Sequence, residues 1–203
     1  GFDPAAKRQE FSELERDVKR YLGDFNPIGG IMRRMCREYR TVVDMLAARG
    51  TAEFSILSAN LYGSAYDAFS AGEPTLADFG QMLSASLSNI DRESVVCEEP
   101  RNIPACDAVA LLQERLDQAF PNPEKTLRVK LSDGIVADAA AGSDYIKLRQ
   151  DAMFNERDLR LLEVHEGWVH LGTTLNGLQQ PVCTFLGKGP PSSTVTQEGL
   201  AVL

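Results

Sequence analysis

This sequence of 203 residues lacks the features that mark a membrane protein or a nucleic-acid binder. No apolar run approaches the roughly 20 residues that a transmembrane helix needs. No secretory signal peptide opens the chain, so we expect a cytoplasmic protein. The formal net charge of −8 argues against the clustered cations that neutralise nucleic-acid phosphates. We therefore expect neither a membrane nor a nucleic acid as the partner.

Cysteine pairs and the common hydrolase motifs are also missing. The four cysteines, Cys36, Cys97, Cys106 and Cys183, form no C-x-x-C pair, which argues against a structural zinc finger. Cys97 and Cys106 flank a proline-containing loop and could form a disulfide in an oxidising compartment, but reduced thiols are the expectation for a cytoplasmic protein. The chain has no G-x-S-x-G nucleophile elbow and no G-x-x-x-x-G-K-[ST] phosphate loop.

Residues 1–120 have the apolar period of amphipathic helices. Apolar residues recur at three- and four-residue intervals, and turn residues such as Asn26-Pro27 interrupt the period. Thr75 with Asp78 predicts a capping box that opens one helix, and residues 103–120 predict another. One basic cluster is interpreted as the solvated face of such a helix: Arg33, Arg34, Arg37 and Arg40.

The pattern changes to the two-residue alternation of β-strands at residues 127–131 and again at 145–149. We expect these two runs to form a small sheet or hairpin. The predicted fold class is therefore α+β, with a helical N-terminal half followed by a small β-sheet and a pair of site-bearing helices. The predicted domains are residues 1–123 and 124–203, and the two could form one continuous domain.

Histidine occurs only twice, and both copies lie in the hexapeptide His165-Glu166-Gly167-Trp168-Val169-His170. Imidazole is the commonest side-chain ligand for metals, and a carboxylate beside a ligand can take a proton from a water on the ion. Asn155 and Asp158 form a capping pair, so we expect the hexapeptide to lie on a helix. The alternative is two ordinary helix histidines, one buried and one solvated.

The spacing of five between His165 and His170 is unfavourable for a shared ion on a regular α-helix. At about 100° per residue the two rings would diverge by roughly 140°. A π-type turn brings residues five apart together, and Gly167 within the spacer tolerates such a distortion. The sequence therefore predicts either a locally widened helix or no shared metal.

A third ligand is available in Glu198. Thr194 and Gln197 fit a T-x-x-Q capping box, which would place Glu198 in the first turns of a further helix. Two histidines on one helix and a carboxylate on a later one is the layout of zinc peptidases with a His₂Glu ligand set. The alternative is a carboxylate that is favoured near a positive helix N-terminus.

Four segments of the C-terminal third resemble a known family. They are His165 to His170, Leu175-Asn176-Gly177, Leu186 to Thr194, and Gln197-Glu198-Gly199-Leu200-Ala201. These segments are similar to bacterial proteins named for their QEGLA motif, which share a domain with the animal microtubule-associated tyrosine carboxypeptidases. The resemblance covers residues 145–203 specifically, and upstream it extends only to Leu61-Tyr62-Gly63-Ser64.

The resemblance implies a zincin-like metallopeptidase with an H-E-x-x-x-H helix and a core that continues beyond Leu203. Carried onto this sequence, His165, His170 and Glu198 would bind Zn²⁺, and Glu166 would be the general base. The expected function is a carboxypeptidase-like zinc metallopeptidase acting on a peptide or protein C-terminus. The alternative is a metal-binding regulatory protein without peptidase activity.

Substrate contacts are expected from the strand that precedes the histidine helix. An exposed edge of residues 145–149 could pair with an extended peptide. Lys147 or Arg149 could then receive a C-terminal carboxylate, since guanidinium groups bind carboxylates in a bidentate manner. The alternative is that both are solvated charges on the outer face of a strand.

Overall fold

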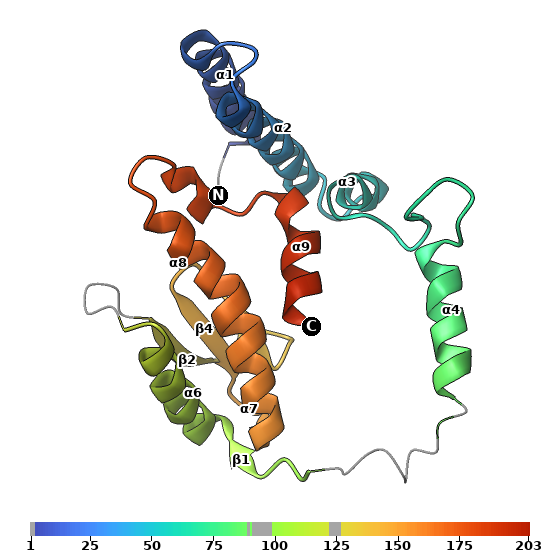
Figure 1. Cartoon of the computed structure of the whole chain (residues 1–203), viewed down its shortest axis with the longest axis vertical. Helices are drawn as coiled ribbons and strands as arrows, with labels where there is room; N and C mark the ends of the chain where they lie inside the picture. Colours follow the sequence, from blue (N-terminus) through green and yellow to red (C-terminus); the bar gives the residue numbers. More distant parts are fainter. Residues whose placement is uncertain (1–2, 89, 91–98, 122–126) are drawn as a thin grey trace. The chain divides into compact units, whose positions relative to one another are not determined.

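The computed structural model describes residues 3–88, 90, 99–121 and 127–203 (Figure 1). Contacts divide the chain into two compact units. The first comprises residues 1–95 with 190–194, and the second comprises residues 96–189 with 195–203. The predicted α+β class is confirmed, with helices before a small sheet and further helices after it.

The first unit consists mainly of helices, and three of the four elements α1 to α4 begin at a side-chain cap. Its elements are α1 (Pro4–Leu22), α2 (Pro27–Ala47), α3 (Ala52–Tyr62) and α4 (Leu76–Leu87). Asp3 and Asn26 accept backbone hydrogen bonds at the starts of α1 and α2, each followed by a proline, whose missing N–H costs nothing in the first turn. The predicted capping box of Thr75 and Asp78 opens α4.

The α1–α2 pair buries one apolar seam and surrounds it with charges. Phe11 stacks on Tyr39, with ring centroids 5.5 Å apart. Arg37 and Arg40 both pair with Glu15, at 2.6 and 2.8 Å, so the basic cluster is a helix surface with acidic partners. The buried side chains of the seam include Val18, Met35, Cys36, Val43 and Met45, and burial raises the pKa of the Cys36 thiol.

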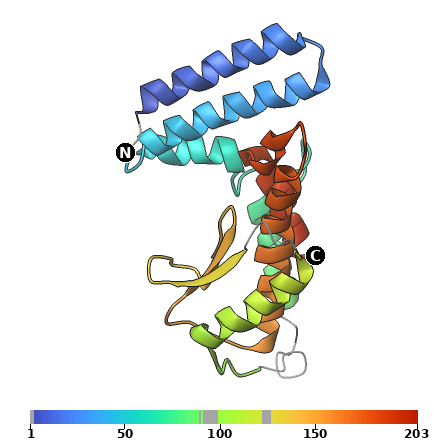
Figure 2. The same ribbon diagram turned by 90° about the vertical axis from the view of Figure 1, so that its left-hand side faces the viewer.

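The second unit places helices on one face of a small sheet (Figure 2). Its strands are β1 (Ile103–Pro104), β2 (Arg128–Ser132), β3 (Ala139–Ala141), β4 (Tyr145–Arg149) and β5 (Met153–Phe154). Its helices are α6 (Ala105–Ala119), α7 (Glu156–Leu162), η1 (Glu163–Leu171), α8 (Gly172–Leu178), η2 (Thr184–Gly187) and most of α9 (Pro191–Ala201). The elements α7, η1 and α8 follow one another without a break and form one rod.

The three-stranded sheet has the order β2-β4-β3, and the predicted sheet is thereby confirmed. Strand β4 runs parallel to β2 and antiparallel to β3. Because β4 has a partner on both sides, the expectation that residues 145–149 form an exposed edge is wrong. The outer strands are β2 and β3, and the three alanines of β3 give no alternating pattern that a sequence could reveal.

The core of the second unit lies between the sheet and the helices. Ile146 and Leu148 of β4 meet Leu112 and Leu116 of α6, and all four are fully buried. Leu171 joins them from the rod. Full burial of a leucine or isoleucine contributes about 1.5–3 kcal/mol each, so this cluster fixes the rod against the sheet.

Helix α8 and η2 approach at backbone distance. A Cβ added at Gly177 would lie 2.3 Å from the backbone nitrogen of Gly187, closer than real Cβ atoms come. A Cβ at Gly187 would lie 2.7 Å from Cγ of Leu178. Two of the segments that carry the family resemblance therefore meet here, and glycine is the residue that allows the approach.

Helix α9 begins earlier than expected, at Pro191. Thr194 and Gln197 therefore lie inside the helix, and the predicted T-x-x-Q capping box is wrong. Proline is well tolerated in the first turn of a helix. Pro191 therefore begins α9, although the pair Pro190-Pro191 is more typical of a loop. Glu198 consequently lies further along the helix than its first turns.

Three of the four cysteines lie in the described part of the chain. Cys36, Cys106 and Cys183 are free, while Cys97, one half of the alternative disulfide, lies outside the described residues.

Among the described helices, none combines the length and the apolar character that a bilayer crossing requires.

Candidate metal centre

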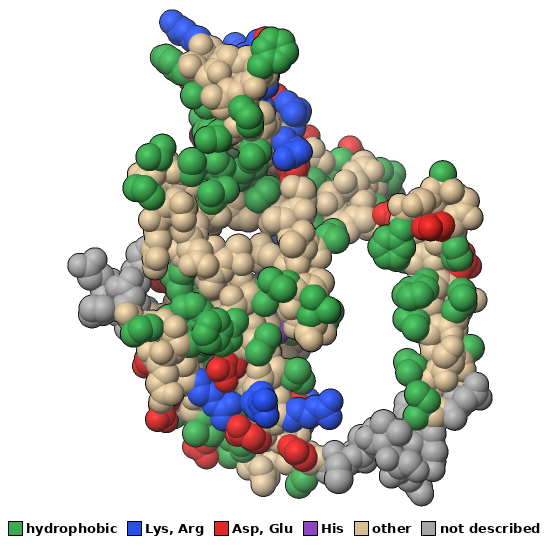
Figure 3. All heavy atoms as spheres, viewed as in Figure 1, with side chains coloured by type: hydrophobic (Ala, Val, Ile, Leu, Met, Phe, Trp, Pro, Cys, Tyr) green, Lys and Arg blue, Asp and Glu red, His purple; other side chains and the backbone are tan. Residues whose placement is uncertain are grey.

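The rod that carries both histidines begins at a reciprocal cap. Asn155 Oδ1 accepts a hydrogen bond from the Asp158 backbone N–H at 2.8 Å, and Asp158 Oδ2 accepts one from the Asn155 N–H at 3.0 Å, as the sequence predicted. Arg101 pairs with Asp158 at 2.9 Å, and Arg115 pairs with Glu156 at 2.6 Å. Figure 3 shows cationic and anionic side chains intermixed over this end of the rod. These contacts fix where the rod starts and therefore which face its later residues occupy.

The rod widens into a π-helix at the histidines. The segment η1 spans Glu163–Leu171, and α-helix resumes at Gly172. In a π-helix, residues five apart lie above one another. The rings of His165 and His170 accordingly meet edge to face, with centroids 4.9 Å apart and planes at 68°. The predicted widening is confirmed.

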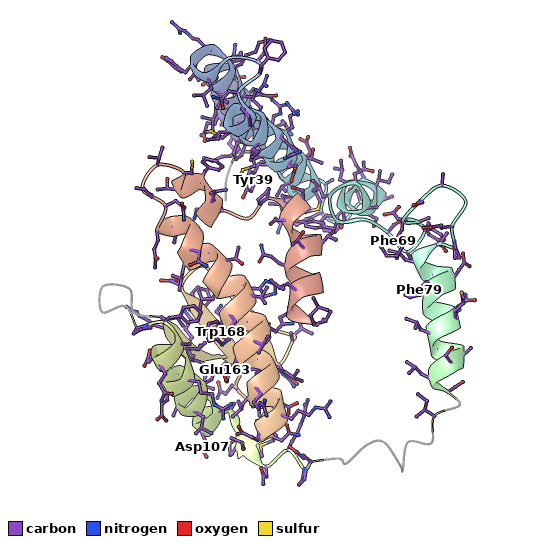
Figure 4. All side chains as sticks on the ribbon, viewed as in Figure 1. Tyr39, Phe69, Phe79, Asp107, Glu163 and Trp168 are labelled. Carbon is purple, nitrogen blue, oxygen red and sulfur yellow. The ribbon has the colours of Figure 1, made fainter. Side chains whose placement is uncertain are left out.

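Packing against α6 holds the widened segment in place. Gly167 is buried, and a Cβ there would lie 2.5 Å from Cδ2 of Leu116. Trp168 packs on Phe120, with ring centroids 5.3 Å apart, and its indole N–H points at Glu163 Oε1 at 3.5 Å. Figure 4 labels Trp168 and Glu163 on this rod. The face of η1 toward α6 is thus filled, and the two imidazoles remain half-buried elsewhere on the segment.

Glu198 of α9 lies against both imidazoles. Its Oε2 is 3.6 Å from His165 Nε2, and its Oε1 is 3.5 Å from His170 Nε2. One ligand atom from each of the three residues lies within 4.8 Å of the other two. The structure therefore brings together the three residues that the sequence singles out as ligands.

The donor set and its spacing fit zinc. Two imidazole nitrogens and one carboxylate oxygen are ligands that Zn²⁺ binds at about 2.0–2.2 Å, so tetrahedral ligands lie about 3.3–3.5 Å from one another. The nitrogen–oxygen distances of 3.5 and 3.6 Å are close to that separation, and each runs to a different oxygen of the Glu198 carboxylate. The three ligand atoms lie within 4.8 Å of one another, so the side chains would have to move closer together to hold one ion.

Glu166 lies beside this cluster and is held by the sheet. Its Oε2 accepts a hydrogen bond from the backbone N–H of Ala141 at 2.9 Å. Ala141 is the last residue of β3, and β3 is the outer strand on this side of the three-stranded sheet. Strand β3, which the sequence did not predict, therefore orients the carboxylate of Glu166, the expected base.

Gln197 is the residue of the site that sequence reasoning missed. Its Oε1 lies 3.0 Å from Nδ1 of His170, the ring nitrogen that does not face Glu198. The sequence placed Gln197 in an expected helix cap and in the motif Gln197 to Ala201, but indicated no contact with His170. That motif was the available signal, because it places Gln197 directly before Glu198.

Lys147 and Arg149 are not brought into the cluster. Ile146 and Leu148 are buried in the core, so their neighbours on β4 extend from the opposite face of the sheet. Arg149 pairs with Asp138 at 2.8 Å, and the Lys147 amine lies 5.5 Å from the Tyr145 ring centroid. Their proposed role in binding a substrate carboxylate stays a prediction.

Comparison with known proteins identifies a family for this chain. Neither curated proteins nor solved structures give a match. A known family, described as microtubule-associated tyrosine carboxypeptidase, matches over residues 1–203. The match covers the whole chain, including the histidine rod and Glu198. The chain therefore belongs to the microtubule-associated tyrosine carboxypeptidase family.

Proposed function

We propose that this chain carries the metal centre of a zinc-dependent carboxypeptidase. The ligands are His165, His170 and Glu198, and Glu166 is the general base. The observation that supports this most is the convergence of two Nε2 atoms and one carboxylate on a helix widened at the histidines. Membership of a carboxypeptidase family supports peptide hydrolysis as the reaction.

Three protein ligands suit a catalytic ion. A structural zinc site usually closes all four positions with protein side chains, whereas a catalytic site keeps one for water or substrate. When bound, Zn²⁺ supplies a Lewis acid that polarises the substrate carbonyl and makes water acidic enough to be deprotonated near neutral pH. The adjacent carboxylate of Glu166 has no use in a purely regulatory metal site, and this favours the enzyme over that alternative.

Glu166 moves the proton in this proposal. It takes a proton from the attacking water and delivers it to the leaving amine as the peptide bond breaks. The hydrogen bond from Ala141 to Oε2 orients the carboxylate and leaves Oε1 to exchange the proton. Held on one side by backbone, the carboxylate loses little entropy when it reaches the reactive geometry.

The edge of β3 is where a peptide substrate would lie. The Gly142 N–H bonds to the Tyr145 carbonyl, and the Asp138 carbonyl accepts from Arg149, so these groups face β4. By alternation, the backbone groups of Ala139 and Ala141 face away from β4, toward Glu166. A peptide added along this edge would pass the proposed base. The pairing with a substrate peptide that was expected of β4 is therefore proposed for the edge of β3.

Glu166→Gln tests the role of the base. The variant should keep about one zinc per chain, because its ligands are untouched, and should lose about 10²–10⁴-fold in peptide hydrolysis. Zinc is measured by plasma mass spectrometry, and hydrolysis by digestion of a peptide library read by mass spectrometry. Glu163→Gln, the same change three residues earlier on the rod, is the control and should hydrolyse normally.

His165→Ala tests the metal centre itself. The variant should lose the bound zinc, and Glu198→Ala should do the same. Wild-type protein that binds no zinc would refute the metal centre, and Glu166→Gln with unchanged turnover would refute the base. Zinc binding with no cleavage of any peptide would favour the regulatory alternative.

A further inference from the structure

The two nitrogens of the His170 ring face different partners. Nε2 lies 3.5 Å from Glu198 Oε1, within the proposed metal centre. Nδ1 lies 3.0 Å from Gln197 Oε1. Both partners come from adjacent residues of α9, so one turn of this helix faces both nitrogens of the same imidazole.

The Gln197 oxygen favours a hydrogen on Nδ1. An amide oxygen can only accept a hydrogen bond, so this contact forms in the tautomer that carries its hydrogen on Nδ1. A neutral imidazole carries one N–H, and Nε2 of His170 then keeps its lone pair. A metal ion requires that lone pair. The opposite tautomer carries its hydrogen on Nε2, and that hydrogen would have to move to Nδ1 before Nε2 could bind a metal ion.

The other histidine differs in its surroundings. The His165 side chain is 32% exposed and the His170 side chain 20%, so the ring that Gln197 contacts is the less solvated of the two. Gln197 itself is half-buried. A hydrogen bond shielded from water competes less with solvent and holds a ring orientation more firmly.

We propose that Gln197 is a positioning residue that fixes the tautomer and orientation of His170 for metal binding. This inference rests on the proposed metal centre. In this proposal Gln197 acts through the imidazole that it contacts and is not itself a ligand. Partners of this kind, behind a ligating histidine, change metal affinity by about 10–100-fold when they are removed.

Three substitutions separate hydrogen bonding from packing. Gln197→Leu keeps most of the volume but removes the acceptor, and it should weaken zinc binding by about 10–100-fold. Gln197→Glu restores an acceptor and should bind zinc at least as tightly as wild type. Thr196→Ala, at the exposed neighbouring position of the same helix, should bind as wild type does. Affinities are measured on the whole chain by competition with a zinc-binding dye.

The tautomer is read directly by nitrogen NMR of metal-free protein. The chain has only two histidines, and His165→Ala assigns the remaining signals to His170. The variant Glu198→Ala removes the carboxylate that competes for a hydrogen on Nε2. In metal-free Glu198→Ala protein at mildly alkaline pH, where a free imidazole is neutral, His170 should carry its hydrogen on Nδ1. Adding Gln197→Leu should move population to the form with the hydrogen on Nε2.

The outcomes distinguish this inference from the proposed function. If wild type binds zinc and Gln197→Leu binds it equally, the positioning role is refuted while the metal centre stands. A His170 that carries its hydrogen on Nε2 in Glu198→Ala protein also refutes the role. If wild type binds no zinc, the metal centre fails first, whatever the tautomer proves to be.

Discussion

The two compact units differ in how deeply they bury their side chains. The largest fully buried residues, from Leu112 to Leu171, all belong to the second unit. In the first unit the buried apolar residues come from α1 and α2, and α3 and α4 have none. The unit with the deep core is the one that holds the histidines and Glu198 together.

This difference shows what a metal centre requires of its surroundings. Ligand atoms must stay within about 0.5 Å of a productive arrangement, and that calls for side chains locked by packing. The helices of the first unit rely on one amphipathic seam, polar caps and exposed ion pairs, which tolerate small movements. Matched substitutions in the two units test this contrast, and changes to an ion pair and a helix cap of the first unit test how little its exposed contacts contribute.

Replacing a leucine by alanine should change the free energy of unfolding very differently in the two units, and this is the largest effect expected. Leu112 is fully buried in the second unit, and its truncation should lower the free energy of unfolding by about 2–5 kcal/mol. Leu83 of α4 is 46% exposed, and the same change there should cost less than about 0.5 kcal/mol. Urea unfolding is followed by fluorescence of Trp168, the single tryptophan, which reports on the second unit, and by circular dichroism for all helices. Equal shifts for the two variants would contradict the contrast.

Gly→Ala should have opposite signs in the two units. At Gly177 the new methyl would collide with the backbone of η2, costing about 1–3 kcal/mol. At Gly80, inside α4, nothing lies within 4 Å, so alanine should stabilise the helix by up to about 1 kcal/mol. Thermal denaturation of both variants provides the measurement. A stabilised Gly177→Ala would show that the close approach of α8 and η2 is not maintained in solution.

Glu15→Gln should weaken the α1–α2 pair modestly. The substitution removes the partner of Arg37 and Arg40, which are partly solvent-exposed, so the loss should be about 1 kcal/mol or less. Because salt screens such pairs, the difference from wild type should shrink in about 1 M NaCl. Thermal melts at low and high salt give the comparison. Glu10→Gln, which removes a more exposed pair with Lys7, is the control and should change less.

Protonation of Asp78 in the capping box of α4 should give the smallest effect, and this loss of stability should occur only in acid. The hydroxyl of Thr75 donates to Asp78 at 2.7 Å, and this bond holds the pKa of Asp78 below its usual range. A depressed folded-state pKa stabilises the helix above the ordinary carboxyl pKa of about 3.9. That contribution is lost as pH falls through the lower folded value. Carboxyl NMR of Asp78 checks the direction, and Thr75→Ala should bring its pKa back toward normal.

Local features of the sequence predicted much of this structure. The caps at Thr75 and Asn155 depend on residues three apart, and both are observed. The π-helix is one of the two alternatives that the spacing of His165 and His170 left open, because a regular helix would turn their rings apart. The nearness of Glu198 was expected from the family resemblance as well as from spacing.

Features that depend on contacts between distant segments were not predictable. Strand β3 consists of alanines, whose small side chains show no polar–apolar alternation, and so β4 was mistaken for an edge. The start of α9 was misplaced because its first turn is rich in proline and serine. Gln197 gained a role only through its distance from His170. The division at residues 123 and 124 stays a prediction, as do the catalytic and metal-binding roles.

The widened turn also lets the rod carry one residue more than a regular α-helix would hold over the same rotation. A turn closed by i→i+5 hydrogen bonds contains one residue more than a turn closed by i→i+4 bonds. The extra residue is therefore taken up within η1, and α-helix resumes at Gly172 without a break. Gly177 still faces the backbone of Gly187, while the rings of His165 and His170 meet edge to face. The rod thus changes the geometry of its histidines without disturbing the contact of α8 with η2.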